Sequence, residues 1–325
     1  MNNDQKNKKV KIFIIIILLL LILLTIGIFV VHAFINNKLK KVSYDVVDKT
    51  QVEVTDGVNE ELSGYRNIVL LGIGDEYGYK GRSDCIIIFS VNRQDKKVKM
   101  TSIYRDTLVE VPGHGYTKIN EAYAIGKATL AMSTINRNLD LNITDYVTIN
   151  IHVVKDLVDA VGGVEIEVPA KEVKHISGIT SAGTYNLTGE QALEYAGIRR
   201  EDLDKNRTEK MRIVLGKTFS KLKQLSLIEI NKIADKILPE IHTSIQESEI
   251  EDTIKNIESY SIGESMGWPH DVENKTIRGE EYVIPNALQK SVQKLHEELF
   301  DETDYKTTET VNKISDTIIK KTGVK

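Results

Sequence analysis

The sequence has very little cysteine, no zinc-binding pattern and no excess of positive charge. Its single cysteine, Cys85, excludes an intramolecular disulfide, and its place in an apolar run favours a buried structural thiol over a reactive one. The seven histidines form neither an HExxH motif nor a cluster with cysteine, which argues against a zinc site. A net charge of −4 argues against general nucleic-acid binding. The composition, 41% hydrophobic and 28% charged, is that of a globular protein.

The N-terminal region contains the longest hydrophobic run. Residues 12–31 carry no charge and are long enough to cross the hydrocarbon core of a bilayer. We therefore predict a cytoplasmic segment (1–11), an uncleaved transmembrane anchor (12–33) and an extracytoplasmic remainder. Lysines flank the run on both sides, so they favour this orientation only weakly. The alternative is a signal peptide cleaved after Ala33, although the run is longer than a typical signal core.

The rest of the chain is typical of an α/β domain with helices on both faces of a central sheet. Residues 34–64 are polar and are expected to form a stalk, and the polar residues 301–325 a flexible tail, with the folded domain between them (65–300). Thr188 and Gln191 form a possible capping box at the start of a helix. Strands are expected at 67–74, 84–92, 98–104, 145–151, 164–169 and 280–284, and helices at 121–138, 152–161, 188–196, 208–225, 226–238, 247–259 and 286–300.

Charged residues flank one end of a predicted β-hairpin. The runs DCIIIFSVN and VKMTSIY are joined by the turn RQDKK, so Val91 is expected opposite Val98 and Asp84 opposite Arg105. If the preceding strand is also antiparallel, Asp75, Arg82 and Asp106 reach the same edge of the sheet. Two carboxylates beside arginines suit Mg²⁺ and a phosphate group. The alternative is a salt-bridged hairpin end without a ligand.

Further basic residues lie in later segments. Lys118 is in a loop with two glycines, which allow close approach of a ligand. Arg199 ends one predicted helix, and Arg207 and Lys210 are spaced i, i+3 near the start of the next. They suit anion binding at a helix start, although ordinary solvated residues remain the alternative.

These stretches resemble the LytR–CpsA–Psr family of bacterial cell-envelope glycopolymer phosphotransferases. They occur in family order over residues 65–220: NIVLLGIGD, RSDCIIIFSVN, KKVKMTSIYRDT, TKINEAYAIG, VDAVGGVEIEVP, LTGEQALEYAGIRR and NRTEKMRIVL. The resemblance implies a central mixed β-sheet between helical layers, preceded by one transmembrane helix. It also implies a membrane-anchored enzyme that transfers wall teichoic acid, capsule or another secondary wall polymer from undecaprenyl pyrophosphate to peptidoglycan.

The resemblance also implies roles for individual residues. Asp84, Arg105 and Asp75 correspond to catalytic positions, and Asp75 and Asp84 to ligands of Mg²⁺ or another divalent cation. Substrate-binding positions correspond to Arg82, Asp106, Lys118, Asn120, Arg199, Arg207 and Lys210.

Three departures from the family pattern qualify this assignment. Tyr104 stands where the family usually has proline, and Gly197 replaces an arginine. An Arg-x-x-Arg-Gln pattern ends here in Lys210 and Met211, and a lysine cannot bind phosphate through a planar fork. These changes imply reduced activity or a different polymer or acceptor. Two alternatives stay open: a non-catalytic envelope regulator that binds polyprenyl phosphate lipids, and a lipid pyrophosphate phosphatase.

Overall fold

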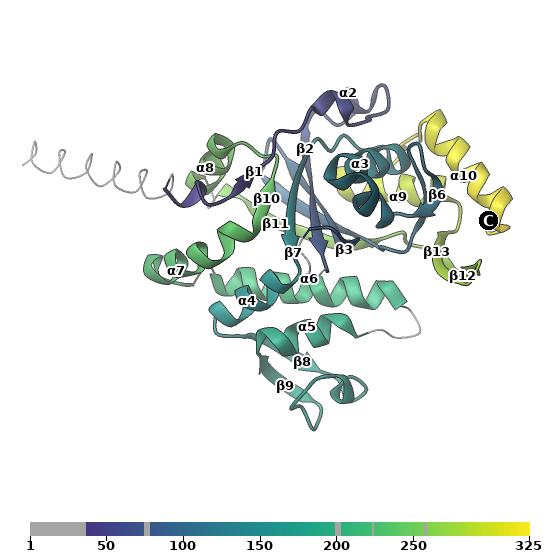
Figure 1. Ribbon diagram of the computed structural model, residues 1–325. Helices are drawn as coiled ribbons and strands as arrows, with labels where there is room; N and C mark the ends of the chain where they lie inside the picture. Colours follow the sequence, from purple (N-terminus) through teal and green to yellow (C-terminus); the bar gives the residue numbers. More distant parts are fainter. Residues whose placement is uncertain (1–36, 75–78, 199–202, 223, 257–258) are drawn as a thin grey trace, which may run out of the picture.

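The computed structural model describes residues 37–74, 79–198, 203–222, 224–256 and 259–325. Its centre is a seven-stranded mixed sheet in the order β1-β10-β7-β2-β3-β4-β11 (Figure 1). The strands are β1 (Ser43–Tyr44), β2 (Tyr65–Ile73), β3 (Ser83–Asn92), β4 (Lys97–Ile103), β7 (Asp145–Asn150), β10 (Ile241–Thr243) and β11 (Ser261–Trp268). The pairs β2–β3, β3–β4 and β7–β10 are antiparallel, and β1–β10, β2–β7 and β4–β11 are parallel.

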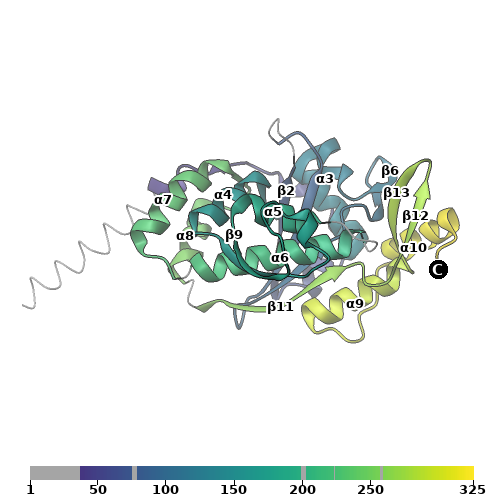
Figure 2. The same ribbon diagram turned by 90° about the horizontal axis from the view of Figure 1, so that it is seen from below.

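Helices cover both faces of this sheet, as the sequence predicted. They are α2 (Val58–Glu61), α3 (Glu121–Leu139), α4 (His152–Ala160), α5 (Gly189–Gly197), α6 (Leu203–Leu222), α7 (Leu227–Ile237), α8 (Glu247–Lys255), α9 (Leu288–Phe300) and α10 (Glu309–Thr322). Short 3₁₀ turns are η1 (Lys49–Gln51), η2 (Val173–His175) and η3 (Leu238–Glu240). Figure 2 shows α4, α5 and α6 together on one side, with α9 and α10 away from them.

Three two-stranded hairpins extend the fold beyond the sheet. They are β5–β6 (Leu108–Val111 and Gly115–Lys118), β8–β9 (Val164–Val168 and Gly183–Leu187) and β12–β13 (Val272–Ile277 and Glu280–Pro285). Strand β8 alternates buried and exposed residues, as predicted. The predicted capping box of α5 is also present, since Thr188 and Gln191 cap each other's backbone.

The two faces of the sheet have separate hydrophobic cores because side chains alternate along each strand. On β3, Ile86 and Ile88 face the core that contains α3, α9 and α10. Ile87 lies on the opposite face, toward α6. The second core joins α4, α5, α6 and the β8–β9 hairpin. The candidate site lies at one edge of the sheet and in the space between the sheet and α6.

Two terminal segments differ from the expectation. In the expected stalk, Val52, Val58 and Leu62 are buried in the α3-side core. In the expected tail, α10 buries Val311, Ile314 and Ile318 in that core. The spacing of these residues is i, i+3, i+7, an apolar stripe that is narrow enough to be missed in a polar segment. Both expectations are therefore wrong for these residues.

The predicted anchor lies outside the described residues. Among the helices of the part that the structure does describe, none has the length and apolar character needed to traverse a bilayer.

Candidate functional site

Three of the five charged residues that were predicted to converge, Asp84, Arg105 and Asp106, lie together at one edge of the sheet. The observed register places Val91 opposite Val98, as predicted, and the pairing continues to Ile86 and Ile103. Just beyond this last pair, the Arg105 guanidinium forms an ion pair with the Asp84 carboxylate. Strand β2 ends at the same edge because it runs antiparallel to β3. The hairpin therefore brings together an acid and a base that are 21 positions apart.

The ion pair continues into a row of alternating charges. Arg105 Nε lies 3.5 Å from Asp106 Oδ2, and Lys118 Nζ lies 3.7 Å from Asp106 Oδ1. Lys118 ends β6, where Leu108 is its partner in the hairpin. Its ammonium also lies 3.6 Å from Glu280 Oε2 and above the ring of Tyr282. Alternating cations and carboxylates at a partly exposed edge can bind an anion and a cation together.

Backbone contacts fix the position of the cluster. Asn120 is buried; its N–H donates to the Arg105 carbonyl at 3.2 Å, and its carbonyl accepts from Ser83 N–H at 3.5 Å. The Asn120 Oδ1 atom is buried and has no hydrogen-bond partner among the described residues. Gly74 presses against the Asp84 carboxylate so closely that a Cβ atom there would overlap it. Asn120 and Gly74 therefore position Arg105 and Asp84.

Other predicted site residues have different surroundings. Arg82 is half exposed and forms an ion pair with Glu121 at 2.7 Å, at the first residue of α3. Lys210 is buried and lies 3.1 Å from Glu172 Oε1, with its ammonium above the ring of Tyr195. Lys210 thus has a structural partner in the second core.

Three predicted residues cannot be placed in the site. Asp75 and Arg199 lie outside the described residues. Arg207 belongs to α6, but its side chain is not described. Their roles stay predictions.

The carboxylates present fit a magnesium ion that shares its coordination with a substrate. Within the described residues, no group of three His, Cys, Asp or Glu side chains is arranged to hold a metal alone. Asp84 and Asp106 nevertheless offer hard oxygen atoms on both sides of Arg105, and both side chains reach solvent. Mg²⁺ commonly takes only one or two protein carboxylates and completes its shell with water and phosphate.

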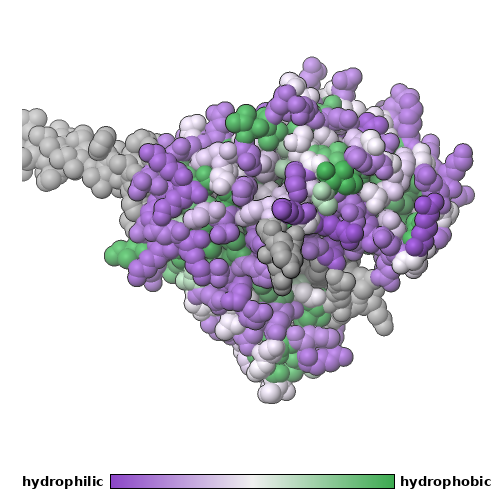
Figure 3. All heavy atoms as spheres, in the orientation of Figure 1, coloured by the Kyte–Doolittle hydropathy of each residue, from purple (hydrophilic) through white to green (hydrophobic). Residues whose placement is uncertain are grey.

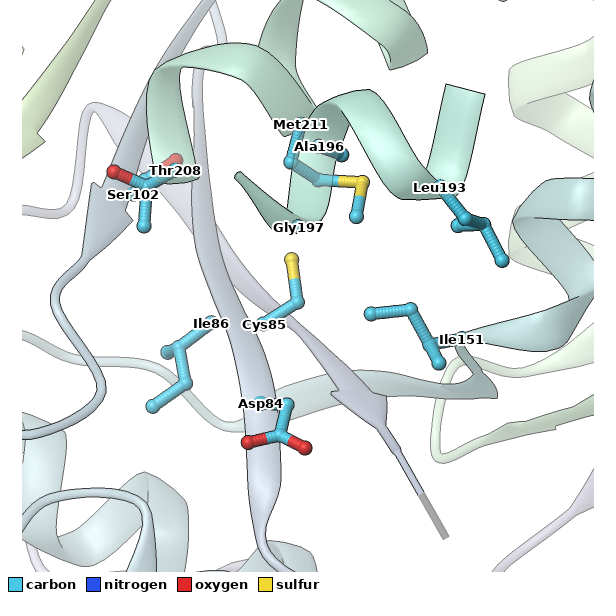
Figure 4. Close-up of a pocket in the computed structure, with 10 residues that line it drawn as sticks. All are labelled: Asp84, Cys85, Ile86, Ser102, Ile151, Leu193, Ala196, Gly197, Thr208 and Met211. Carbon is cyan, nitrogen blue, oxygen red and sulfur yellow. The ribbon is translucent and has the colours of Figure 1, made fainter. Parts of the chain in front are cut away.

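A cavity of about 160 Å³ opens beside Asp84, between the sheet and the α5–α6 helices. In Figure 4 the Cys85 sulfur points toward Gly197 and Met211, whereas the Asp84 carboxylate points away from them. Thr208 and Met211 come from α6, and Gly197 ends α5. Two of the residues that depart from the family pattern, Gly197 and Met211, therefore border the cavity. Cys85 is half-buried in the cavity wall and not fully buried in the core.

A second cavity, of about 400 Å³, continues along the same strand and helix. We call it the α6 groove. Strand β3 contributes Ile87, Phe89 and Val91, which follow Cys85 on one face at intervals of two residues. Helix α6 contributes the opposite wall, and Leu157 of α4 adds to it. Helix α4 therefore helps to line the groove, whereas α3 packs in the core on the other face of the sheet.

Sequence reasoning missed several residues of the site. Glu280 and Tyr282 reach Lys118 from β13, and only the tertiary fold brings them there. Arg212 lines the α6 groove. The apolar side chains around it come from strands that are distant in the sequence, so its position could not be predicted from its neighbours in the chain. One sequence feature could have identified Arg212: it is a charged residue on the apolar stripe of α6, four residues after Thr208.

Comparisons with known proteins identify the family of this chain. The model of the LytR_cpsA_psr family matches residues 29–304. A protein of Enterococcus faecalis named polyisoprenyl-teichoic acid–peptidoglycan teichoic acid transferase TagU is 37% identical over 192 residues, which are 57% of this chain and 62% of that protein. The Bacillus cereus protein of the same name is 29% identical over 276 residues, 81% of this chain and 88% of that one. These relatives are named as transferases.

The fold comparison points to the same class. The structure of Bacillus subtilis TagT with bound octaprenyl pyrophosphate lipid superposes with a TM-score of 0.58 at 26% identity, and the match covers 81% of this chain and all of that one. The α/β fold with a central mixed sheet is therefore that of these proteins. The chain belongs to the LytR_cpsA_psr family.

Proposed function

We propose that this protein is a membrane-anchored phosphotransferase that attaches a cell-wall glycopolymer, carried on a polyprenyl pyrophosphate, to peptidoglycan. One observation supports it most: the row of charges at Asp84–Arg105 adjoins an apolar groove beneath α6. A ligand that fits both parts has a strongly anionic head and a long apolar tail. The named activity of the TagU relatives and the lipid bound to TagT support the same ligand class.

The chemistry follows from the charges. The hydroxyl oxygen of the acceptor attacks the phosphorus that carries the glycan, forming one P–O bond while the phosphoanhydride bond breaks. The electron pair of that bond leaves with the polyprenyl phosphate, and the hydroxyl proton passes to Asp84. Arg105 and Lys118 stabilise the negative charge that grows on the leaving phosphate. Mg²⁺, with Asp75 and Asp84 as protein ligands, would supply further neutralisation of that charge.

A transfer assay with product analysis tests this proposal. The purified protein receives a polyprenyl pyrophosphate-linked polymer and peptidoglycan, with and without Mg²⁺. We expect polymer bound to peptidoglycan only with the metal, and none with Asp84→Asn, which keeps shape but removes the charge. Asp95→Asn, in the turn at the other end of the same hairpin, is the matched control and should retain transfer.

The products separate the competing functions. Free phosphorylated polymer would identify a phosphatase. Lipid binding without any product would identify a regulator. Either result contradicts the transferase proposal.

A further inference from the structure

A cationic side chain, Arg212, lies on the inner wall of the α6 groove. It follows Thr208 by four residues and precedes Leu215 by three, so the three residues share the face of α6 that is turned toward the sheet. Thr208 borders the cavity beside Asp84, and Leu215 borders the groove. Arg212 therefore occupies the boundary between the polar and the apolar parts of the site.

The Arg212 guanidinium lacks a partner within the described part of the chain. Its Nη1 atom is buried without a hydrogen bond, and no ion pair joins it to any described carboxylate. Burial lowers the pKa of Arg212, because loss of solvent disfavours the charged guanidinium. Two more deeply buried cations are engaged: Lys99 contacts Asp301, and Lys210 contacts Glu172. A half-buried guanidinium whose Nη1 atom is buried without a partner is costly, so its presence points to an anionic ligand.

The direction of the side chain locates that anion. Long side chains in a helix lean toward its N-terminus, which for Arg212 is toward Thr208 and the Asp84 cavity. Its ionisable neighbours are Tyr104 and Cys85, at the same end of the sheet, and Glu209, an exposed residue of α6. The anion would therefore lie between the cavity beside Asp84 and the α6 groove.

We infer that Arg212 binds the phosphate esterified directly to the lipid chain, and so adds to the stabilisation that Arg105 gives this leaving phosphate. This inference rests on the proposed function and adds a residue to it. The guanidinium also offers the planar, bidentate donors that Gly197 and Lys210 do not provide. Arg212 is thus a substrate-binding residue that selects a phosphorylated lipid over its neutral alcohol.

The role of Arg212 can be tested by measuring the binding of short isoprenoids to the full-length protein. The probes are farnesyl phosphate, farnesyl pyrophosphate, farnesol and inorganic phosphate, measured by calorimetry. The variants are Arg212→Met and the control Lys217→Met, which removes an exposed cation from the same helix. Wild type should bind farnesyl phosphate about tenfold or more tightly than farnesol, the ratio that a charged hydrogen bond provides. Inorganic phosphate should bind weakly because it cannot fill the groove.

The variants should separate recognition from folding. Arg212→Met should lose the preference for farnesyl phosphate, keep its affinity for farnesol within about twofold, and melt at the same or a higher temperature. Lys217→Met should resemble wild type. Two results would contradict the role of Arg212 in phosphate binding. In the first, Arg212→Met keeps the preference for farnesyl phosphate over farnesol; in the second, it loses farnesol binding and melts at a lower temperature. If wild type binds none of the isoprenoids, the lipid carrier of the proposed function fails as well.

Discussion

Asp84 is held in its position from two sides. Arg105 pairs with its carboxylate, and the backbone of Gly74 lies against the same group. Gly74→Ala would push the carboxylate away, because its added methyl group would occupy the same space. We expect transfer to fall at least tenfold with a small change in melting temperature, since the displaced group is a side-chain end. Gly64→Ala, at a position open to solvent, is the control. Equal activity of both variants would show that the carboxylate position is unimportant.

Arg105 and Lys210 are both basic, but their surroundings predict opposite effects of substitution. Arg105→Ala removes a charge from the site and should reduce transfer about ten- to a hundredfold, with little loss of stability. Lys210→Met removes a buried cation that lies beside the buried carboxylate of Glu172 and should lower the free energy of unfolding by about 3–5 kcal/mol. Chemical denaturation and the transfer assay measure both effects. A stable but inactive Lys210→Met variant would return Lys210 to the substrate site.

At the level of elements, the strands and helices of the core could be predicted because their patterns are local. The β3–β4 register follows from two apolar runs and one turn, and it placed Asp84 beside Arg105 correctly. Strand β11 was not predicted: Ser261–Trp268 contains two glycines, is largely exposed, and pairs with β4 from a distant part of the chain. Nothing in its own sequence indicates a strand.

The site, like the fold, could be predicted only where it depends on local sequence patterns. Residues that flank the hairpin were identified, because antiparallel pairing brings its two ends together. The contacts of Lys118 with β13, the burial of Lys210 against Glu172 and the exposure of Arg212 to the groove depend on packing between distant segments. The charge pattern alone does not contain that packing.

Helix α10 offers a test of the corrected C-terminus. Ile314 is a residue of α10 whose side chain is buried in the α3-side core. Ile314→Ala should therefore lower the free energy of unfolding by about 2–4 kcal/mol. The same substitution at Ile228, which is 70% exposed on α7, should cost less than about 0.5 kcal/mol. Figure 3 shows apolar atoms on the surface at the α7 edge. Denaturant titration compares the two, and equal small losses would restore the flexible tail.

At the level of the whole molecule, the first described residues are tied to the domain. Lys38 and Lys41 both pair with Asp235 of α7, and Ser43–Tyr44 joins the sheet beside β10. From Lys38 onward, the chain is therefore part of the folded domain and not a free stalk.

The topology of the chain can be measured directly in cells. If residues 12–33 form an uncleaved anchor, the domain that follows should be accessible to protease added to intact cells after removal of the wall, because the uncharged run is favourable in the bilayer. The membrane fraction should keep a protein whose N-terminus precedes residue 12, and a cytoplasmic protein should stay intact as the control. Replacing Leu20 and Leu21 with aspartate should release the protein from the membrane, since two charges at the centre of the run oppose insertion by about 5–7 kcal/mol together. Complete protection of the domain from protease would reverse the orientation, and a mature N-terminus just after Ala33 would replace the anchor with a cleaved signal.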